Sequence, residues 1–444
     1  MALPALGDVA GAQETQPVVR SNVSVIRIRD GEVSRTSLWT LSPQARPDVY
    51  RAQLANGKPH RVTFITDVDS ISFLVEEGKQ YDFVVQKGDT ANYTRIVGAR
   101  LVPAPGIVAG QVTVAANPAR VCLDPRPTPY LNFDLIVRNG TEGEIRVAEL
   151  RALVLNAAGQ VVERRVVGQQ ALELLGPGRV VGPLSDALIF NPFTFGTVRE
   201  GSRLRYELLL AGAGAPAASV MVEPRPCLPR TRLVSPLAGR VAVFDGYDFL
   251  SHHRRTDYLG GLRTLGATDN PSRFAMDLMV VDSAGRAFRG DSTRNEAWLG
   301  WGRPVRAAGD GIVAATHDGQ PDNDTVGVEN RWTQRSVARE PMTTFGNYVL
   351  IDHGNGEFSL TAHLQAGSLR VRQGDHVKAG DVVARVGNSG SSRGPHVHYE
   401  LRSGWGFVVT TMPPYFRDVR VTGTGEGRGG APVPVNTGDF FVAR

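Results

Sequence analysis

The sequence predicts a mostly β protein built from three domains. Glycine and proline are frequent, with 50 and 28 copies among 444 residues, whereas aromatic residues make up only 7% of the chain. This composition favours many short strands joined by turns over long helices. Apolar and polar residues alternate in successive short segments that end in turn signals, as in strands with one buried face. The length exceeds one ordinary core and suggests about two to four domains.

Two β-sandwich-like accessory domains are predicted in the first half of the chain, at residues 17–104 and 108–228. The first contains the alternating segments SVIRIR, HRVTFITDV, SISFLV, YDFVVQ and NYTRIV. The second contains YLNFDLIVRN, RVAELRALVLN, QVVERRVV and RLRYELLLAG, at the spacing expected of a sandwich. The proline-containing stretches VPAPGIVAG and EPRPCLPRTRLVSPL mark the two boundaries.

The remaining sequence is predicted to form an antiparallel sheet over residues 230–420, followed by a C-terminal tail at 421–444. Its strands are short and separated by glycine, as in GRPVRAAGDGIVAATHDG and GNYVLIDHGNGEFSLTAHL. Every histidine except His60 lies in this part of the chain. Two segments, 283–301 and 318–344, are rich in Asp, Asn, Arg and Gly and lack a strand pattern. Loops of this length are usually functional or disordered, so we expect these two to border a groove.

The composition argues against two classes of function. The net charge of +5 is modest for this length, and the arginines are spread along the chain without forming a basic run. We therefore expect no nucleic-acid partner. The chain contains no apolar run long enough to cross a bilayer, so we expect no transmembrane segment. With 41% apolar and 21% charged residues, the chain has the composition of a globular protein.

The two cysteines bear on the cellular compartment. The N-terminal stretch MALPALGDVAGAQETQ has neither a basic leader nor an apolar stretch long enough for an intact secretion signal. The protein therefore either stays inside the cell or has lost its signal. Cys122 and Cys227 lie beside prolines at the two ends of the second predicted domain. A bridge between them would contribute on the order of 4–5 kcal/mol, and we expect this disulfide and export over the alternative of two unrelated buried thiols.

The segment GPHVHYEL, residues 394–401, places two histidines on alternate positions of a predicted strand. Side chains at i and i+2 of a strand point to the same face, so His396 and His398 face one space together. A catalytic zinc ion has three protein ligands drawn from His, Asp, Glu and Cys, with a fourth position for water. His363 and Asp277 supply further donors in the same domain. In such a site the metal activates water, while an unligated histidine moves protons and hydrogen-bonds the oxyanion.

These segments resemble the lysostaphin-type (LytM-like) zinc metallopeptidases, which cut peptide cross-links of bacterial peptidoglycan. The resemblance covers about residues 234–402 and rests on GRPVRAAGDGIVAA, GNYVLIDHGNGEFSLTAHL and VRQGDHVKAGDVVARVGNSGSSRGPHVHYEL, in this order. It implies a lysostaphin-like antiparallel β-sheet peptidase domain, a Zn²⁺ cofactor and a cell-wall peptide substrate. Carried over by position, it implies that Asp277 and His398 bind the zinc. It also implies that His363 and His396 are the catalytic pair.

One position departs from the family pattern. The family has a histidine four residues before the zinc-binding aspartate, where this chain has Arg273. Arginine stays protonated and has no lone pair to donate, so it cannot bind the metal. The segment FLSHHRRTDYLGGL supplies His252 and His253, which could fold back beside the strand that carries Asp277. We expect His253 to be the third ligand, with His252 or a decayed metal site as alternatives. For Arg273 itself we expect a surface salt bridge.

The sequence therefore favours a zinc metalloendopeptidase that hydrolyses peptidoglycan peptides and is exported to the periplasm or beyond the cell. The alternative is a catalytically inactive, metal-free relative that binds cell-wall peptides or activates another hydrolase. Arg273 and the two long loops motivate this alternative. A third possibility, a cytosolic protease that acts on another protein, requires that the two cysteines be reduced. The N-terminal β domains are candidate surfaces for a protein partner.

Overall fold

The computed structural model describes most of the chain beyond residue 105. Between residues 23 and 102 it describes the backbone of eight strands. The chain is mostly β, as the sequence predicts. None of the described helices is long and apolar enough to cross a membrane. Beyond residue 105, the described residues are 106–123, 130–173, 175, 179–212, 216–249, 251–259, 261–264, 266–330, 341–422 and 433–444.

The first eight strands form two four-stranded sheets. One has the order β2-β1-β5-β6, in which β1 and β5 run parallel. The other has the order β3-β4-β7-β8 and is antiparallel. Each of the five segments that the sequence predicts as strands in this region contains a strand. The bounds are β1 Val23–Arg29, β2 Glu32–Val33, β3 Trp39–Pro43, β4 Val49–Leu54, β5 His60–Ile65, β6 Ser70–Val75, β7 Gln80–Lys87 and β8 Thr94–Val102.

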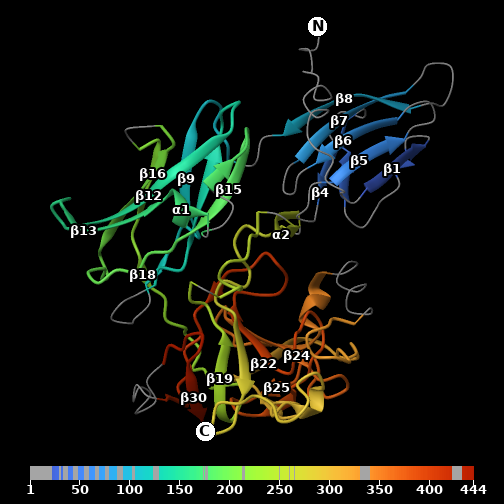
Figure 1. Ribbon diagram of the computed structural model, residues 1–444. Coiled ribbons are helices and arrows are strands. Elements are labelled where there is room, and N and C mark those ends of the chain that lie inside the picture. The colour runs from blue at the N-terminus through green and yellow to red at the C-terminus, as the bar shows by residue number, and fades with distance from the viewer. Residues whose placement is uncertain are drawn as a thin grey trace.

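Residues 112–226 form two antiparallel sheets that share an apolar core, which we call the two-sheet unit (Figure 1, cyan to green). One sheet has the order β15-β11-β9, and the other has the order β13-β12-β16-β17 with β14 beside β12. In the core, the rings of Phe133 and Tyr206 meet edge to face at 5.3 Å. The bounds are β9 Val112–Asn117, β11 Asp134–Asn139, β12 Ile145–Leu155, β13 Val161–Gly168, α1 Gln169–Leu172, β14 Val180–Val181, β15 Ser185–Phe190, β16 Arg203–Leu210 and β17 Ala218–Val222.

A disulfide closes the end of the two-sheet unit that adjoins the rest of the chain. The short strands β10 (Cys122–Leu123) and β18 (Arg225–Pro226) pair in parallel there. Cys122 and Cys227 are bonded, with their Cα atoms 5.3 Å apart and a sequence separation of 105. The predicted disulfide is thereby confirmed. Cys122 also packs against the core of the C-terminal sheet, so the bond lies where the two parts of the molecule meet.

The C-terminal part is built on a ten-stranded sheet with the order β25-β22-β23-β24-β27-β20-β19-β30-β29, in which β28 pairs with β27 (Figure 1). Every pairing in it is antiparallel, as predicted. A two-stranded sheet, β21-β26, lies beside it. The strand bounds are β19 Gly239–Asp245, β20 Met276–Val280, β21 Pro304–Arg306, β22 Gly311–His317, β23 Asn347–Asp352, β24 Phe358–Leu364, β25 His376–Val377, β26 Val382–Arg385, β27 Val397–Arg402, β28 Thr411–Met412, β29 Val419–Val421 and β30 Phe440–Ala443. The helices are α2 Gly261–Thr264, η2 Asn295–Ala297 and η3 Pro341–Phe345.

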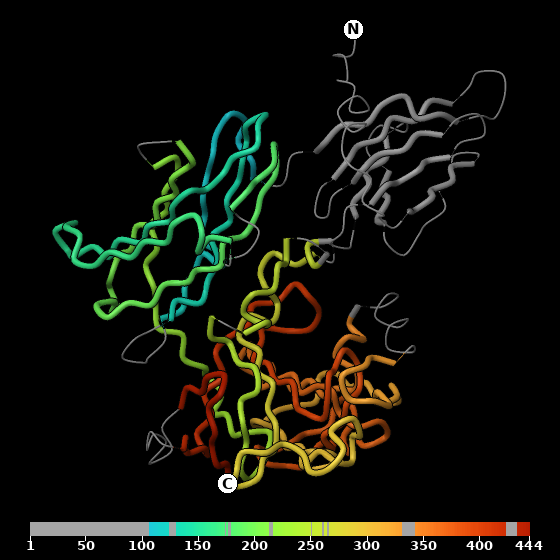
Figure 2. Tube along the Cα trace, viewed as in Figure 1, coloured from blue at the N-terminus to red at the C-terminus, as the bar shows by residue number. Residues whose placement is uncertain are grey.

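The segment expected to be a C-terminal tail, 421–444, contributes strand β30 to this sheet. β30 pairs with β19 on one side and β29 on the other. Figure 2 shows the C-terminal end of the chain beside β19, the first strand of this sheet in the sequence. The physical reason is the alternation of FFVA, in which Phe441 and Ala443 point into the apolar core.

Strand β27 separates the apolar core from a polar face of the sheet. Val397, Tyr399 and Leu401 are fully buried in the apolar core. The intervening His398 and Glu400 therefore lie on the opposite face, since neighbouring side chains of a strand alternate. Both are also buried, so the polar face is covered by other parts of the chain.

Candidate metal centre

Three neighbouring strands bring the predicted site residues together. In the register of β20 and β27, Asp277 is directly opposite His398. On the other side of β27, His398 pairs with Ala362 of β24, and His363 follows. His396 immediately precedes β27 and bridges to Gly387. The sheet thus places an aspartate and three histidines at one end of three adjacent strands. The spacing in the sequence predicts the shared position of His396 and His398, and the family resemblance implies the other two.

Three imidazoles converge on a single oxygen of Asp277. Its Oδ1 atom lies 3.2 Å from His398 Nδ1, 3.3 Å from His396 Nε2 and 3.6 Å from His253 Nε2. All four side chains are less than a tenth exposed. A single carboxylate oxygen surrounded by three buried ring nitrogens is an unusual concentration of ligand atoms.

These separations agree with the dimensions of a zinc site. Zinc–nitrogen and zinc–oxygen bonds of about 2.0–2.2 Å in a tetrahedron place neighbouring ligand atoms roughly 3.3–3.5 Å apart. The distances from Asp277 Oδ1 to His398 Nδ1 and to His253 Nε2, 3.2 and 3.6 Å, lie near this range. The donor types, imidazole and carboxylate, are also those that zinc prefers. The described residues therefore fit a bound zinc ion.

The histidine doublet lies in the segment between β19 and β20, residues 246–275, which we call the connecting segment. It folds back so that His253 is buried, with its ring 4.9 Å from the ring of His398. His252 remains 71% exposed at its side chain and contacts Asp245. Among the described residues, Asp245, His252, His253 and Asp277 form one group of ligand atoms within 4.8 Å of one another. His398 is not a member of that group, although its Nδ1 lies 3.2 Å from Asp277.

Two carboxylates that sequence reasoning missed face the outer nitrogens of these histidines. Glu400 Oε1 lies 2.9 Å from His398 Nε2. Asp245 Oδ2 lies 3.2 Å from His253 Nδ1, but without hydrogen-bond geometry, so that buried nitrogen is unsatisfied. Histidine ligands commonly use their second nitrogen to contact a carboxylate, which orients the ring.

Each of these carboxylates carries a different signal in the sequence. Glu400 is two residues after His398 on a strand and must share its face. Asp245 ends the alternating run Val241, Val243, Asp245, but a register shift after Val243 brings it opposite Asp277. A bulge of this kind leaves no clear mark in the sequence. Glu400 was therefore predictable from alternation, whereas Asp245 was not.

The electrostatics of the site favour a cation beside Asp277. Burial would raise the pKa of the Asp277 carboxyl, but His253 and His396 hold it well below its usual range. Burial also lowers the pKa of His398, yet hydrogen bonds with Asp277 and Glu400 outweigh it and raise that pKa to about 9. A positive charge is thus held between two buried carboxylates, which is the charge that a metal ion would supply.

His363 and His396 have the arrangement of proton carriers. His363 Nδ1 lies 2.8 Å from the carbonyl oxygen of Ser389, and His396 Nδ1 lies 2.7 Å from that of Gly394. A carbonyl only accepts hydrogen bonds, so each Nδ1 carries a proton. The Nε2 atom of His363 is then left as an acceptor, whereas the Nε2 atom of His396 faces Asp277 Oδ1 at 3.3 Å. The two rings lie 4.8 Å apart.

His363 also departs from ordinary backbone geometry. Its φ angle is +59°, in the left-handed region that non-glycine residues seldom occupy. Burial, together with the rings of His396 and His398, holds its pKa well below the usual value. His363 is therefore neutral, and a strained backbone of this kind is characteristic of functional positions.

A groove of about 690 Å³ opens over these residues. Trp298 lies on one wall and comes from the predicted loop 283–301, and Glu329 and Thr344 come from the predicted loop 318–344. The expectation that both loops border a groove is confirmed for their described residues, while 331–340 lie outside them. The groove is also lined by His252, His253, Asp277, Phe345, His363, Arg393, His396, His398 and Phe407.

The prediction of a surface salt bridge for Arg273 is wrong. Its side chain is 1% exposed and pairs with Asp134 of the two-sheet unit and with Asp269. The reason is that residues 130–134 pack against the connecting segment and exclude water from the guanidinium, as the hydrogen bonds from Asn132 illustrate. Arg273 therefore makes a buried contact between two parts of the chain, and it does not line the groove.

Comparison with known proteins places part of this chain in a family. Residues 299–408 match Peptidase family M23. A DD-carboxypeptidase/endopeptidase, Mpg, of Neisseria meningitidis is 38% identical over 101 residues, which are 23% of this chain and 17% of that protein. The peptidoglycan DD-endopeptidase ShyA of Vibrio cholerae is 33% identical over 100 residues, 22% of this chain and 17% of that protein. The match thus spans less than a fifth of these relatives.

A solved structure is also similar. The catalytic domain of a mutant of EnpA, a prophage-encoded M23 protein from Enterococcus faecalis, is 23% identical and covers 31% of this chain and 73% of its own, at a TM-score of 0.20. That score is too low to support an argument about shared structure. The family match contains His363, His396 and His398, whereas His253 and Asp277 lie on its N-terminal side. Residues 299–408 of this chain form a peptidase M23 domain of the LytM-like type.

Proposed function

We propose that this protein is a zinc-dependent endopeptidase that hydrolyses peptide bonds of bacterial peptidoglycan. The observation that carries the proposal is the convergence of His253, His396 and His398 on Asp277 Oδ1 at the base of the groove. The M23 family match supports the reaction class. The Vibrio cholerae relative is named as a peptidoglycan DD-endopeptidase, which supports the substrate class.

Asp277, His398 and His253 would hold the zinc ion. A zinc ion held there would lower the pKa of a bound water and would polarise the carbonyl oxygen of a substrate. Glu400 would orient His398 through the outer nitrogen of its ring. Asp245 faces the outer nitrogen of His253 at 3.2 Å, without a hydrogen bond.

His363 and His396 would carry out the proton transfers. The Nδ1 atom of each ring donates to a carbonyl, and the Nε2 atom of His396 faces Asp277. The Nε2 atom of His363 is left unprotonated. Such a nitrogen accepts a proton from the attacking water, and the resulting imidazolium donates a proton to the leaving amine. The protonated ring also hydrogen-bonds the oxygen of the scissile carbonyl as negative charge develops there.

Export to the periplasm or beyond the cell belongs to the same proposal. The Cys122–Cys227 disulfide is typical of oxidising compartments. In this proposal residues 17–104 and 108–228 are accessory domains, open to a protein partner, and residues 230–420 carry the chemistry. Strand β30, beyond this last limit, completes the sheet.

The test is zinc content combined with digestion of purified peptidoglycan. We expect about one zinc per chain, as in a catalytic site with three protein ligands, and release of new amino groups from cross-linked peptidoglycan. Removal of zinc with a chelator is expected to abolish release, and added zinc to restore it. A chain that binds no zinc after its addition would instead support the metal-free binding protein that Arg273 motivates, in which case binding to peptidoglycan without cleavage is expected.

Replacement of Glu400 with glutamine is expected to weaken zinc binding. The carboxylate contacts His398 Nε2, and loss of such an orienting partner typically lowers metal affinity about 10- to 100-fold. Competition with a chromophoric chelator measures the change. Glu357→Gln is the matched control, because Glu357 is also buried but bonds the backbone of Arg230 and Thr231 instead. Equal zinc affinities in the two variants would show that Glu400 does not support zinc binding.

A further inference from the structure

We propose that the two-sheet unit is part of the metal centre, because its residue Asp134 positions His253. Asp134 begins β11, and its carboxylate reaches across to two arginines of the connecting segment. One of them, Arg254, is the direct neighbour of His253 in the chain. The other, Arg273, occupies the position where the family pattern has a histidine ligand. The inference rests on the proposed zinc site and assigns a function to a residue more than a hundred positions before it.

The contact is a buried network of charges. Asp134 Oδ1 accepts from Arg254, which also donates to the carbonyl oxygen of Phe133. Asp134 Oδ2 lies 2.8 Å from Arg273 Nη2, and Arg273 also pairs with Asp269. The exposed fractions are 0% for Asp134, 2% for Arg254 and 1% for Arg273. Two carboxylates and two guanidiniums balance in charge, which is the condition for stable burial of ionised groups.

The network reaches the backbone of His253 in two ways. Arg254 follows His253 directly in the chain, and Asn270, which follows Asp269, bonds its carbonyl oxygen. Asn270 Nδ2 donates to the carbonyl oxygen of His253 at 2.7 Å and to that of Arg254 at 3.3 Å. Because Arg254 is fixed by Asp134, the backbone of residues 253 and 254 is held from two directions. The His253 ring is buried, with its Nε2 atom 3.6 Å from Asp277 Oδ1.

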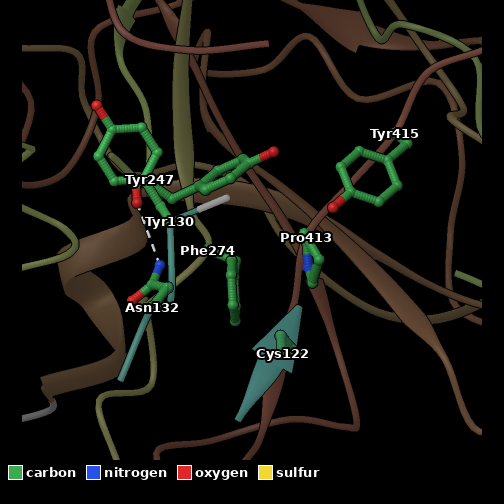
Figure 3. Close-up of a pocket in the computed structure, with 7 residues that line it drawn as sticks. All are labelled: Cys122, Tyr130, Asn132, Tyr247, Phe274, Pro413 and Tyr415. Atoms are coloured by element: carbon green, nitrogen blue, oxygen red, sulfur yellow. Dashed lines mark hydrogen bonds between the residues drawn. The ribbon is translucent and has the colours of Figure 1, made fainter. Parts of the chain in front are cut away.

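A second residue of the two-sheet unit fixes the two ends of the connecting segment. Asn132 Nδ2 donates to the carbonyl oxygens of Tyr247 and Arg273, each at 3.1 Å. Figure 3 shows the bond to Tyr247 and places Asn132 and Tyr130 near Phe274 and Tyr247. Asn132 and Asp134 thus hold the connecting segment near its start, at Tyr247 and Arg254, and near its end, at Arg273.

This arrangement accounts for the arginine at position 273. An arginine there cannot bind zinc, but it can pair with Asp134 and Asp269 in a dry interface. The same interface brings His253 to Asp277 and so supplies a ligand from another part of the chain. Ligand geometry is sensitive to supporting contacts beyond the first ligands. The M23 domain of this protein therefore depends on the two-sheet unit to complete its metal site.

The test is the isosteric variant Asp134→Asn in the full chain, with Asp186→Asn as matched control. Asp186 lies on β15 of the same unit and pairs with Arg263 of the same connecting segment, at 2.7 and 3.1 Å, but not through a neighbour of His253. We expect zinc affinity, measured by chelator competition, to fall about 10- to 100-fold in Asp134→Asn and to stay unchanged in Asp186→Asn. The visible spectrum of the Co²⁺-loaded protein is expected to change only in Asp134→Asn, because a ligand is displaced.

A second readout does not depend on metal. Hydrogen exchange of residues 251–259 in the metal-free proteins is expected to be faster in Asp134→Asn than in the wild type, and unchanged in Asp186→Asn. If the wild type binds no zinc, the proposed function fails, whereas the exchange experiment still decides the positioning. Should Asp134→Asn not fold, Arg254→Lys is the second variant, because lysine keeps the positive charge but lacks the paired donors of the planar guanidinium. A smaller change in zinc affinity and hydrogen exchange, in the same direction, is expected. If the folded Asp134→Asn variant had the zinc affinity of the wild type and the same protection from hydrogen exchange, the inference would be overturned.

Discussion

Replacement of His253 with alanine is expected to remove zinc from the protein while leaving its fold in place. Without this ring, Asp277 and His398 are the only remaining proposed ligands, and two ligands are too few for an ordinary zinc site. Because the loss of an orienting partner alone costs about 10- to 100-fold in affinity, we expect a loss of at least about 100-fold here. Metal analysis by mass spectrometry and chelator competition measure it, and circular dichroism checks the fold.

Two variants serve as controls for this result. His252→Ala changes the adjacent histidine, which is 71% exposed, and is expected to keep its zinc. His396→Ala is expected to keep zinc and to lose about 10²- to 10⁴-fold in turnover, as expected for loss of a proton carrier. If His253→Ala bound zinc fully while His252→Ala did not, the group around Asp245 would hold the metal by way of His252.

Restoring the family histidine, by the variant Arg273→His, is expected to damage the protein. The guanidinium pairs with Asp134 and Asp269 in a site that water does not reach. Breaking a buried pair leaves a carboxylate without its partner and costs about 3–5 kcal/mol of stability. A neutral imidazole of smaller reach cannot replace both contacts. Urea unfolding measures the loss in stability, and we expect zinc affinity to fall with it because His253 loses part of its support.

The opposite result has a clear meaning. If the protein had merely lost its metal ligand at this position, Arg273→His would raise zinc content and hydrolysis, and the account of His253 as third ligand would be contradicted. Arg263→His is the control, because Arg263 also pairs with a carboxylate of the two-sheet unit, Asp186. It is expected to lower stability less than Arg273→His, since its side chain is 16% exposed.

Much of the fold follows from local pattern. The alternation within segments such as YLNFDLIVRN and VHYELR predicts strands, and these are β11 and β27. The same alternation places His396 and His398 on one face, and both rings do approach the same oxygen of Asp277. The strands and the shared face of His396 and His398 depend on short-range periodicity, which the sequence records directly. The pairing that brings Asp277 opposite His398 joins positions 121 apart, and it is implied by the family resemblance and not by local pattern.

The other features depend on contacts between distant segments. Arg273 meets Asp134 across 139 positions, and nothing near either residue marks the pair. A charged residue is usually exposed, so burial of this arginine ran against the ordinary expectation. Asp245 reaches the site through a register shift. Strand β30 joins a sheet whose first strand lies about two hundred residues earlier. Such contacts are set by the assembled tertiary structure, and local propensity does not encode them.

Anomalous diffraction from crystals of the full chain grown with zinc tests the central claim most directly. The account predicts one zinc ion bound by Asp277, His398 through Nδ1 and His253 through Nε2, with Arg273 still paired to Asp134. A zinc ion bound without His253, or no anomalous signal at this position, would contradict it.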